Sequence, residues 1–214
     1  MKSFLIIGVG SFGYHLIKYL FNQQCETLVV DKCEEKLERI LPYATSAKIA
    51  DCTNADVLAS FDVENFDAAF VCVDSDFVAA LEITCLLNDL GAKKIYSCAD
   101  HDIQARLLSR NGAHHIIYPE KDIAKRTAIN VSNESIFDSF ELAEDFFVFE
   151  IAVKEEWVGK TLRELNFRAK YSVNVLAGKA FGKVHPINSP DYIFEWNTHI
   201  LVMGTREDMK RLTD

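Results

Sequence analysis

The stretch Phe4-Leu5-Ile6-Ile7-Gly8-Val9-Gly10-Ser11-Phe12-Gly13 decides the fold of this chain. Its apolar start is typical of a buried parallel strand, and its glycines follow the pattern G-x-G-x-x-G that turns such a strand into a helix. Gly8 permits the tight turn, Gly10 allows the backbone to approach a pyrophosphate, and Gly13 lets the helix pack on the strand. Because a helix N-terminus attracts anions, the motif predicts a nucleotide-phosphate site.

A second apolar segment, Thr27-Leu28-Val29-Val30-Asp31, supports this prediction, since it ends in an acid 18 residues after Gly13. Dinucleotide sites place a ribose-binding carboxylate at about this distance. Two alternatives remain: Asp31 caps the following helix, or the glycines only form a corner. We favour ribose contact, which would select a free 2′-hydroxyl over the 2′-phosphate of NADP.

The composition is that of a soluble globular protein. Of 214 residues, 49% are hydrophobic and 26% charged, which excludes a largely disordered chain. The net charge of −9 disfavours nonspecific binding to nucleic acid or anionic lipid. No apolar stretch is long enough to span a bilayer, and no signal-peptide pattern is present. We therefore expect a cytoplasmic protein without direct membrane insertion.

Six cysteines are scattered along the chain without any C-x-x-C pair. Most lie in apolar segments, so buried thiols are favoured over disulfides or a zinc site.

Predicted helices and strands alternate over residues 1–130, with Asp76 as the expected cap of one helix. This alternation predicts an α/β domain with a Rossmann-like, doubly wound parallel sheet that binds ligands at the carboxyl ends of its strands. Helices are expected at 12–23, 34–41, 54–60, 77–90, 103–111 and 119–130, and further strands at 46–50, 68–73, 94–99 and 115–117.

The pattern changes after residue 130. Residues 131–145 are rich in Ser, Asn, Asp and Glu and predict a connector, in which Ile136, Phe137 and Phe140 are available to pack on a partner. Residues 146–214 predict a small α+β domain. Its strands are expected at 147–153, 172–177 and 199–203, and its helices at 161–166 and 206–212.

The chain resembles the cytoplasmic gating subunits of Trk and Ktr potassium-uptake systems, which are built from RCK domains. The resemblance covers almost the whole chain. The most specific match is the segment Gly112-Ala-His-His-Ile-Ile-Tyr-Pro-Glu120, together with the small C-terminal domain and its Trp157-Val-Gly-Lys-Thr-Leu162. It rests also on the glycine motif, on Asp31 and on the segment Asp51-Cys52-Thr53.

This resemblance implies an adenine-nucleotide site for ADP, ATP, AMP or NAD(H). Asp51 and Cys52 match the segment beside the adenine, although an ordinary polar strand end explains them equally well. Val73 and Asp74 follow the fourth strand, near the point where the strand order reverses. The implied ligand-binding residues are Gly8, Gly10, Ser11, Phe12, Gly13, Asp31, Lys32, Asp51, Cys52, Val73 and Asp74.

Two further sites follow from the resemblance. Glu120 corresponds to an acid that approaches Mg²⁺ or Ca²⁺ at the nucleotide phosphates, although an acid in a first helical turn is also favoured without metal. Arg168 and Asn174, with Val175, resemble the pattern with which some members bind cyclic di-AMP. The alternative is a solvated Arg and a turn Asn.

One departure from the family concerns Ser11, because Ktr-type members commonly carry Arg at this position. That Arg reaches the nucleotide phosphates across a subunit contact. A serine hydroxyl brings no charge to a triphosphate, so the identity of the nucleotide stays open.

The resemblance implies a noncatalytic regulator of K⁺ flux through a separate integral-membrane subunit of Trk or Ktr type, at the inner face of the membrane. It also implies a homodimer that exchanges helix 119–130 and assembles into a ring, possibly an octamer. The alternative is an NAD-dependent oxidoreductase or an NAD(H)-sensing regulator. Tyr14 and Lys18 have a dehydrogenase-like spacing, but they lie beside the phosphate turn rather than near a nicotinamide, so no catalytic residue is assigned.

Overall fold

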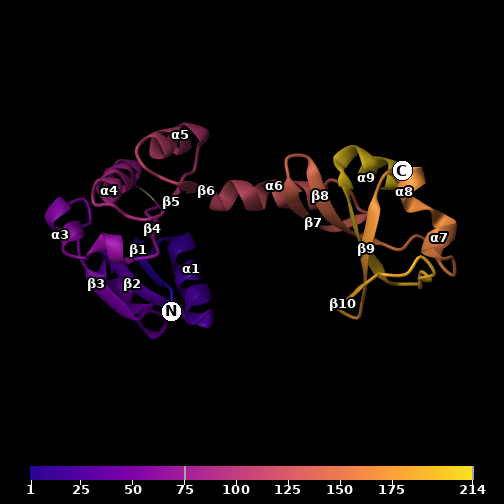
Figure 1. The fold of residues 1–214 in the computed structure, drawn as a ribbon, viewed down its shortest axis with the longest axis horizontal. Helices are drawn as coiled ribbons and strands as arrows, with labels where there is room; N and C mark the ends of the chain where they lie inside the picture. The colour runs from indigo at the N-terminus through magenta and orange to yellow at the C-terminus, as the bar shows by residue number, and fades with distance from the viewer. Residues whose placement is uncertain (75, 214) are drawn as a thin grey trace. The chain divides into compact units, whose positions relative to one another are not determined.

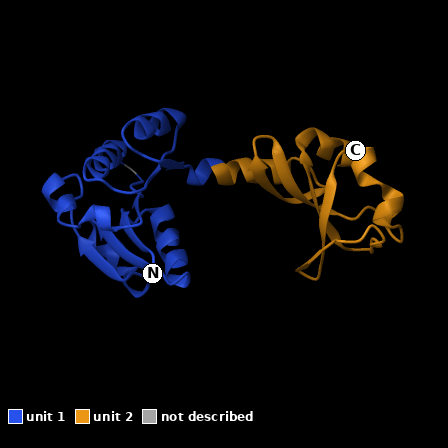
Figure 2. Ribbon diagram, in the orientation of Figure 1, with its two compact units in different colours: residues 1–121 blue, residues 122–214 orange. Residues whose placement is uncertain are grey.

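The computed structural model describes residues 1–74 and 76–213, which form two compact units (Figure 1). Contacts within the chain divide it into Met1–Lys121 and Asp122–Asp214, coloured separately in Figure 2. The first unit contains a six-stranded parallel sheet and the second a five-stranded antiparallel sheet. The predicted fold class, a Rossmann-like domain followed by a small α+β domain, is therefore confirmed.

The parallel sheet has the strand order β3-β2-β1-β4-β5-β6. Ile7, the last residue of β1, pairs with Val30 on β2 and with Val71 on β4. Because β1 lies between β2 and β4, the strand order reverses here and the carboxyl ends of the three strands meet at one edge. The strands are β1 Ser3–Ile7, β2 Glu26–Asp31, β3 Ser46–Ile49, β4 Ala68–Val71, β5 Ile95–Cys98 and β6 His115–Ile117.

Helices follow the strands as the alternation predicts. They are α1 Ser11–Asn22, α2 Glu34–Glu38, α3 Ala55–Ala59, α4 Phe77–Asp89, α5 Asp102–Arg110 and α6 Pro119–Val131, with short 3₁₀ turns η1 Leu41–Tyr43 and η2 Val63–Asn65. Asp76 caps α4 by accepting a hydrogen bond from the Ala79 N–H at 3.0 Å, as predicted. Helix α2 is shorter than expected: it ends at Glu38, and Leu41–Tyr43 around Pro42 form the separate 3₁₀ turn η1.

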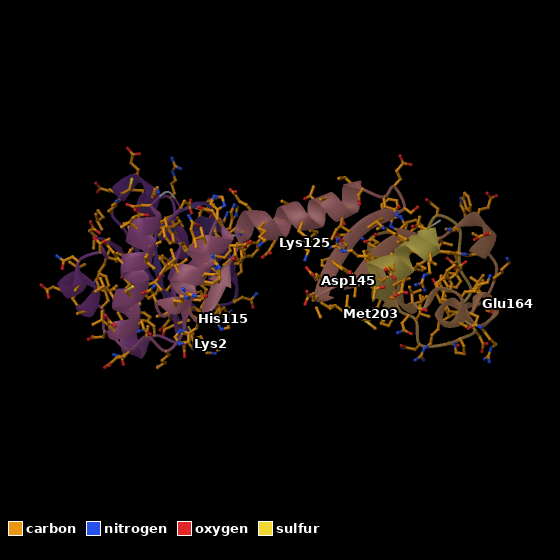
Figure 3. The ribbon with its side chains drawn as sticks, turned by 90° about the horizontal axis from the view of Figure 1, so that it is seen from above. Lys2, His115, Lys125, Asp145, Glu164 and Met203 are labelled. Atoms are coloured by element: carbon orange, nitrogen blue, oxygen red, sulfur yellow. The ribbon has the colours of Figure 1, made fainter. Side chains whose placement is uncertain are left out.

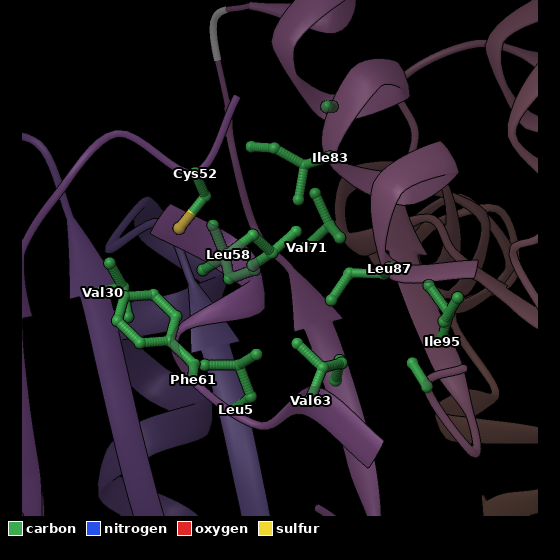
Figure 4. Packing of buried hydrophobic residues seen from close by; sticks show 14 residues of the cluster. Leu5, Val30, Cys52, Leu58, Phe61, Val63, Val71, Ile83, Leu87 and Ile95 are labelled. Atoms are coloured by element: carbon green, nitrogen blue, oxygen red, sulfur yellow. The ribbon is translucent and has the colours of Figure 1, made fainter. Parts of the chain in front are cut away.

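Apolar residues cover both faces of this sheet, as expected for strands with continuous apolar runs. Figure 4 shows one face, where Leu5, Val30 and Val71 from the strands pack with Leu58 of α3 and Ile83 of α4. On the other face, α1 contributes the buried residue Ile17. Apolar packing of helices on both faces therefore fixes the strands whose carboxyl ends form this edge of the sheet.

The second unit has the strand order β10-β9-β11-β8-β7. Its core gathers around Trp157, Phe167 and Phe194, which are almost fully buried. Figure 3 places Asp145 in the turn between β7 and β8, and Met203 on β11. The elements are β7 Ile136–Ala143, β8 Phe146–Ala152, η3 Glu155–Trp157, α7 Leu162–Leu165, α8 Phe167–Tyr171, β9 Asn174–Ala180, β10 Lys183–Pro186, β11 His199–Thr205 and α9 Arg206–Thr213.

The structure differs from the expected connector over 131–145, because most of that segment forms strand β7. The strand lies at the sheet edge with mostly exposed side chains, so its sequence lacks the apolar alternation of a half-buried strand. Strand β10 was also not among the expected strands; it is the other edge strand of the sheet and contains Pro186, a residue that edge strands tolerate.

The boundary between the units also lies earlier than the expected end of the first domain at residue 130. Helix α6 crosses it, and the later part of the helix contacts the second unit. Asn130 accepts a hydrogen bond from the Ser139 hydroxyl at 2.6 Å, and Ile129 packs against the second core.

Candidate nucleotide-binding site

The glycine turn after β1 lies in a narrow space between β2 and β4. The Gly8 N–H donates to the Val30 carbonyl at 2.8 Å, and Gly8 has a φ of +93°. A Cβ at this residue would lie 2.7 Å from the Cys72 carbonyl oxygen. Only glycine combines this left-handed conformation with such close backbone contact.

Gly13 brings α1 against the same turn. A Cβ on Gly13 would lie 2.5 Å from the Gly8 carbonyl oxygen. Gly13 is buried, and the first turn of α1 packs directly against the backbone of Gly8. Because Gly13 has no side chain, α1 can pack this close to the turn, with its N-terminus at the carboxyl edge of the sheet.

Two acids accept hydrogen bonds from the turn. Asp31, 8% exposed, accepts from the Val9 N–H at 2.7 Å and from the Cys33 N–H at 2.8 Å. Asp74 accepts from the Ser11 N–H at 2.7 Å. The side chain of Asp31 therefore joins the end of β2 to the glycine turn. Helix α2 has Cys33 as its N-cap, without a side-chain cap, so the helix-capping alternative for Asp31 is wrong.

A cavity of about 100 Å³ lies on the β2 side of the turn. It gathers predicted residues from four separate segments of the chain, together with Lys36, Thr53 and Asp76, which the sequence analysis did not assign to the site. The sequence offered only a weak indication that Lys36 belongs to the site, namely a cationic residue on the helix that follows Asp31. The predicted residues that line the cavity are Gly8, Gly10, Asp31, Lys32, Asp51, Cys52, Val73 and Asp74.

Asp51 and Cys52 have different environments in this cavity. Asp51 accepts hydrogen bonds from the Thr53 N–H at 3.0 Å and the Thr53 hydroxyl at 2.8 Å, and these bonds lower the pKa of its carboxyl. Burial, followed by the charges of Asp51 and Asp31, raises the pKa of Cys52 to about 12. Asp51 is thus a charged and exposed residue of the cavity lining, whereas Cys52 is a neutral and buried one.

A larger cavity, of about 450 Å³, lies on the β4 and β5 side of the turn. Ser11, Phe12, Val73 and Asp74 line it, and so does Glu120 from the start of α6. The sequence analysis missed three polar residues that also line it, His15, Asp100 and Gln104. The position of Asp100, two residues after the end of β5, was the available signal, because the carboxyl ends of parallel strands share an edge.

Within residues 1–74 and 76–213, no group of three or more His, Cys, Asp or Glu side chains could hold a metal ion. The side chains around Glu120 therefore do not form a cation cage by themselves. A hard cation there would need additional oxygen ligands, such as those of phosphates.

The second unit brings Arg168, Asn174 and Val175 together around a cavity of about 440 Å³. Arg168 lies on α8 and Asn174 begins β9, and both are exposed. Arg163 and Asn166 line the same cavity. Exposed cationic and amide side chains at one cavity could bind an anionic ligand.

The parallel sheet, the glycine turn and the cavities beside it define a Rossmann-type nucleotide-binding domain. Residues 4–119 match the TrkA-N domain family, and residues 146–214 match the TrkA-C domain family. The chain belongs to the family of proteins that combine these two domains, as the resemblance predicted. In the described part of the chain, no helix is long and apolar enough to cross a membrane.

Curated relatives match the chain over nearly its whole length. The Ktr system potassium uptake proteins C and A of Bacillus subtilis (strain 168) are each 32% identical to it, over 98% of this chain and 95% of theirs. Among solved structures, the GsuK RCK domain has a TM-score of 0.69 at 16% identity. That alignment covers 99% of this chain and 47% of the GsuK chain, and shows a shared fold.

Proposed function

We propose that this protein is a cytoplasmic regulatory subunit of a potassium-uptake system, in which nucleotide binding at the glycine turn controls K⁺ flux through a separate membrane subunit. The observation that carries the proposal is the turn itself, with the N-terminus of α1 and a cavity on each side. The likeness to two Ktr potassium uptake proteins along nearly the full chain supports it.

The proposed ligand is an adenine nucleotide, namely ADP, ATP, AMP or NAD(H). The GsuK channel, which shares this fold, has been solved bound to NAD. Asp31 and Asp51 would face the ribose and adenine side, where Lys32 and Lys36 add positive charge. The start of α1 would hold the phosphates through its backbone N–H groups. With Ser11 rather than Arg, the turn offers less charge to a triphosphate, which favours NAD(H) or ADP.

Two finer assignments belong to the same proposal. A Mg²⁺ or Ca²⁺ ion would use Glu120 together with phosphate oxygens of the nucleotide. Cyclic di-AMP would bind the second unit at Arg168 and Asn174, which share a cavity.

Control of a membrane pore requires a partner, because no described helix could itself span a membrane. The proposed partner is a Trk- or Ktr-type membrane subunit, contacted by a homodimer that assembles into a ring of as many as eight subunits. Exposed apolar residues on α6 and β7, including Ile123 and Phe137, support an association of copies. Nucleotide binding would favour one of two arrangements of the assembly, and so bias the pore.

A variant with Asp in place of Gly10 tests this proposal. The new carboxylate would add bulk and like charge where the backbone should meet the phosphates, so titration calorimetry should detect no binding of ADP, ATP, AMP or NADH. The control is Gly182→Asp, which adds the same charge in the β9–β10 turn, where a Cβ meets open space and the φ of +75° is one that Asp adopts more readily than most residues. Nucleotide binding by the Gly10 variant equal to wild type would refute the site.

A flux measurement tests the regulatory role. Membrane vesicles that contain the K⁺ subunit should respond to nucleotide when the wild-type protein is added, and should not respond with Gly10→Asp. A K⁺ flux that stays the same with and without the protein and the nucleotide would refute the regulatory role. It would not argue against nucleotide binding.

The oxidoreductase alternative predicts turnover instead. Lys18 Nζ lies 5.4 Å from the ring centroid of Tyr14 on α1 and 5.0 Å from that of Tyr43 on η1, so it packs between two aromatic rings. We expect no hydride transfer from NADH to a panel of aldehydes and ketones. Turnover that is lost in Tyr14→Phe would support the enzyme instead.

A further inference from the structure

The carboxylate of Asp74 lies at the position where the glycine motif predicts a phosphate. Its Oδ2 atom accepts a hydrogen bond from the N–H of Ser11, the first residue of α1, at 2.7 Å. The same carboxylate lies against the Gly10 backbone, because a Cβ built on Gly10 would come within 2.0–2.2 Å of its atoms. The space that the missing side chain of Gly10 leaves for a ligand is thus filled by an acid of the chain.

The position of this acid is unfavourable for an anionic ligand. The first N–H groups of a helix have no partner within the helix and attract an anion, and Asp74 already accepts the N–H of Ser11. Asp74 also lines both cavities beside the turn, so a phosphate that bridges them would meet its charge. Two like charges at contact distance repel strongly in such a site.

The two acids on the turn differ in how readily they can leave. Asp31 is buried and bonded through both oxygens to backbone N–H groups, so moving it would cost two hydrogen bonds. Asp74 is exposed, and one of its oxygens accepts a hydrogen bond from the turn. Rotation of its side chain would release the Ser11 N–H to another acceptor.

We propose that Asp74 is an internal competitor for the nucleotide phosphate. Its carboxylate holds the start of α1 and is displaced when a phosphate accepts the Ser11 N–H in its place. Asp74 therefore lowers the affinity for adenine nucleotides in proportion to the charge they bring to the turn, and it sets the threshold concentration for the ligand response. The inference rests on the proposed nucleotide-binding function.

The test compares ADP with adenosine, which lacks phosphates, on wild-type protein and on Asp74→Asn and Asp74→Ala. Both variants should bind ADP about tenfold more tightly, which corresponds to roughly 1.4 kcal/mol. Their affinity for adenosine should change less than twofold. Asp89→Asn is the matched control, since Asp89 is an exposed acid at the end of α4 that lines neither cavity. It removes the same charge and should leave the ADP affinity near that of wild type.

Each outcome decides between the claims. ADP affinity that stays equal or falls in both Asp74 variants, while their melting curves match wild type, would overturn the competitor role and leave the nucleotide site standing. An equal gain for adenosine, or an equal gain in Asp89→Asn, would also overturn it, because the effect would not be local to the phosphate. If wild-type protein and all variants bind no adenine nucleotide, the proposed function itself fails.

Discussion

At the scale of single residues, Gly13 couples the first helix to the turn before it. Alanine normally favours a helix over glycine by about 1 kcal/mol, yet a Cβ here would lie 2.5 Å from the Gly8 carbonyl oxygen. Because the nearest atoms are the Gly8 carbonyl and the Cβ of buried Cys72, at 3.0 Å, little relaxation is possible and the clash should dominate.

We therefore expect Gly13→Ala to lower the free energy of unfolding by about 2 kcal/mol, measured by urea denaturation. Ser11→Ala, on the same helix but exposed, should change it by less than about 0.5 kcal/mol. A Gly13→Ala protein more stable than wild type would show that α1 moves freely against the turn.

Cys52 should be chemically inert in the native protein. Its side chain is 3% exposed, and burial together with Asp51 and Asp31 raises its pKa to about 12. Since the thiolate is the reactive form, on the order of one Cys52 thiol in ten thousand is ionised at about pH 8. Alkylation followed by peptide mass analysis should label the partly exposed Cys33 well before Cys52. Equal labelling rates would contradict the buried position of Cys52.

At the scale of elements, a bidentate ion pair joins α6 to β7. Arg126 Nε donates to Asp138 Oδ1 at 2.9 Å and its Nη2 to Oδ2 at 2.6 Å, while Asn130 donates to the same carboxylate at 3.1 Å. The hydrogen bonds from Arg126 contribute most to lowering the pKa of Asp138 below its ordinary value of 3.8. The pair thus connects the helix to an edge strand.

This pair should stabilise the second unit in a pH-dependent way. Because the folded pKa of Asp138 is lowered, its contribution is complete above the ordinary pKa and is lost as the pH falls through the folded value. Arg126→Gln should lower the unfolding free energy at pH 7 by up to about 1 kcal/mol, given partial exposure. Urea titrations at stepwise lower pH should show this difference shrinking.

The matched control is the more exposed pair Arg163–Asp191, with side chains 67% and 72% exposed. Arg163→Gln should have almost no effect, because solvent screens exposed pairs. A difference between wild type and Arg126→Gln that grows in acid would contradict the assignment.

At the scale of the whole molecule, apolar side chains on α6 and β7 remain exposed within one chain. They are Ile123, Val131, Phe137, Phe140 and Leu142, with exposed fractions of 46–76%. Exposed apolar side chains of this size on two elements favour association with a partner surface. We expect them to be covered in the proposed assembly of copies.

Phe137→Asp should therefore shift the protein toward smaller species, because an unpaired charge would enter the interface. Light scattering with and without nucleotide measures the shift. Phe181→Asp serves as the control: Phe181 is fully exposed and has a φ of 50°, a conformation that Asp tolerates well. A wild-type protein that stays monomeric at every concentration and with every nucleotide would remove the physical basis for ring gating.

The strand, turn and helix of the nucleotide motif, the α/β alternation and the cap at Asp76 could all be predicted from the sequence. These features depend on local rules, since apolar runs, glycine spacing and capping residues act over a few neighbours. The likeness of the segment 112–120 and of the small second domain to Trk and Ktr subunits likewise identified the family before any coordinates. The edge strands β7 and β10 escaped prediction, because their residues gain strand structure from pairing rather than from their own pattern.

Only the tertiary structure decided which acids touch the turn. The Asp31 carboxylate reaches Val9, 22 residues away, and the Asp74 carboxylate reaches Ser11, 63 residues away. Neither contact follows from spacing along the chain, because each depends on how β2 and β4 flank β1. The same holds for the cavities on either side, whose residues come from separate segments. Local sequence specifies elements, whereas the electrostatics of a site depend on side chains that only packing brings together.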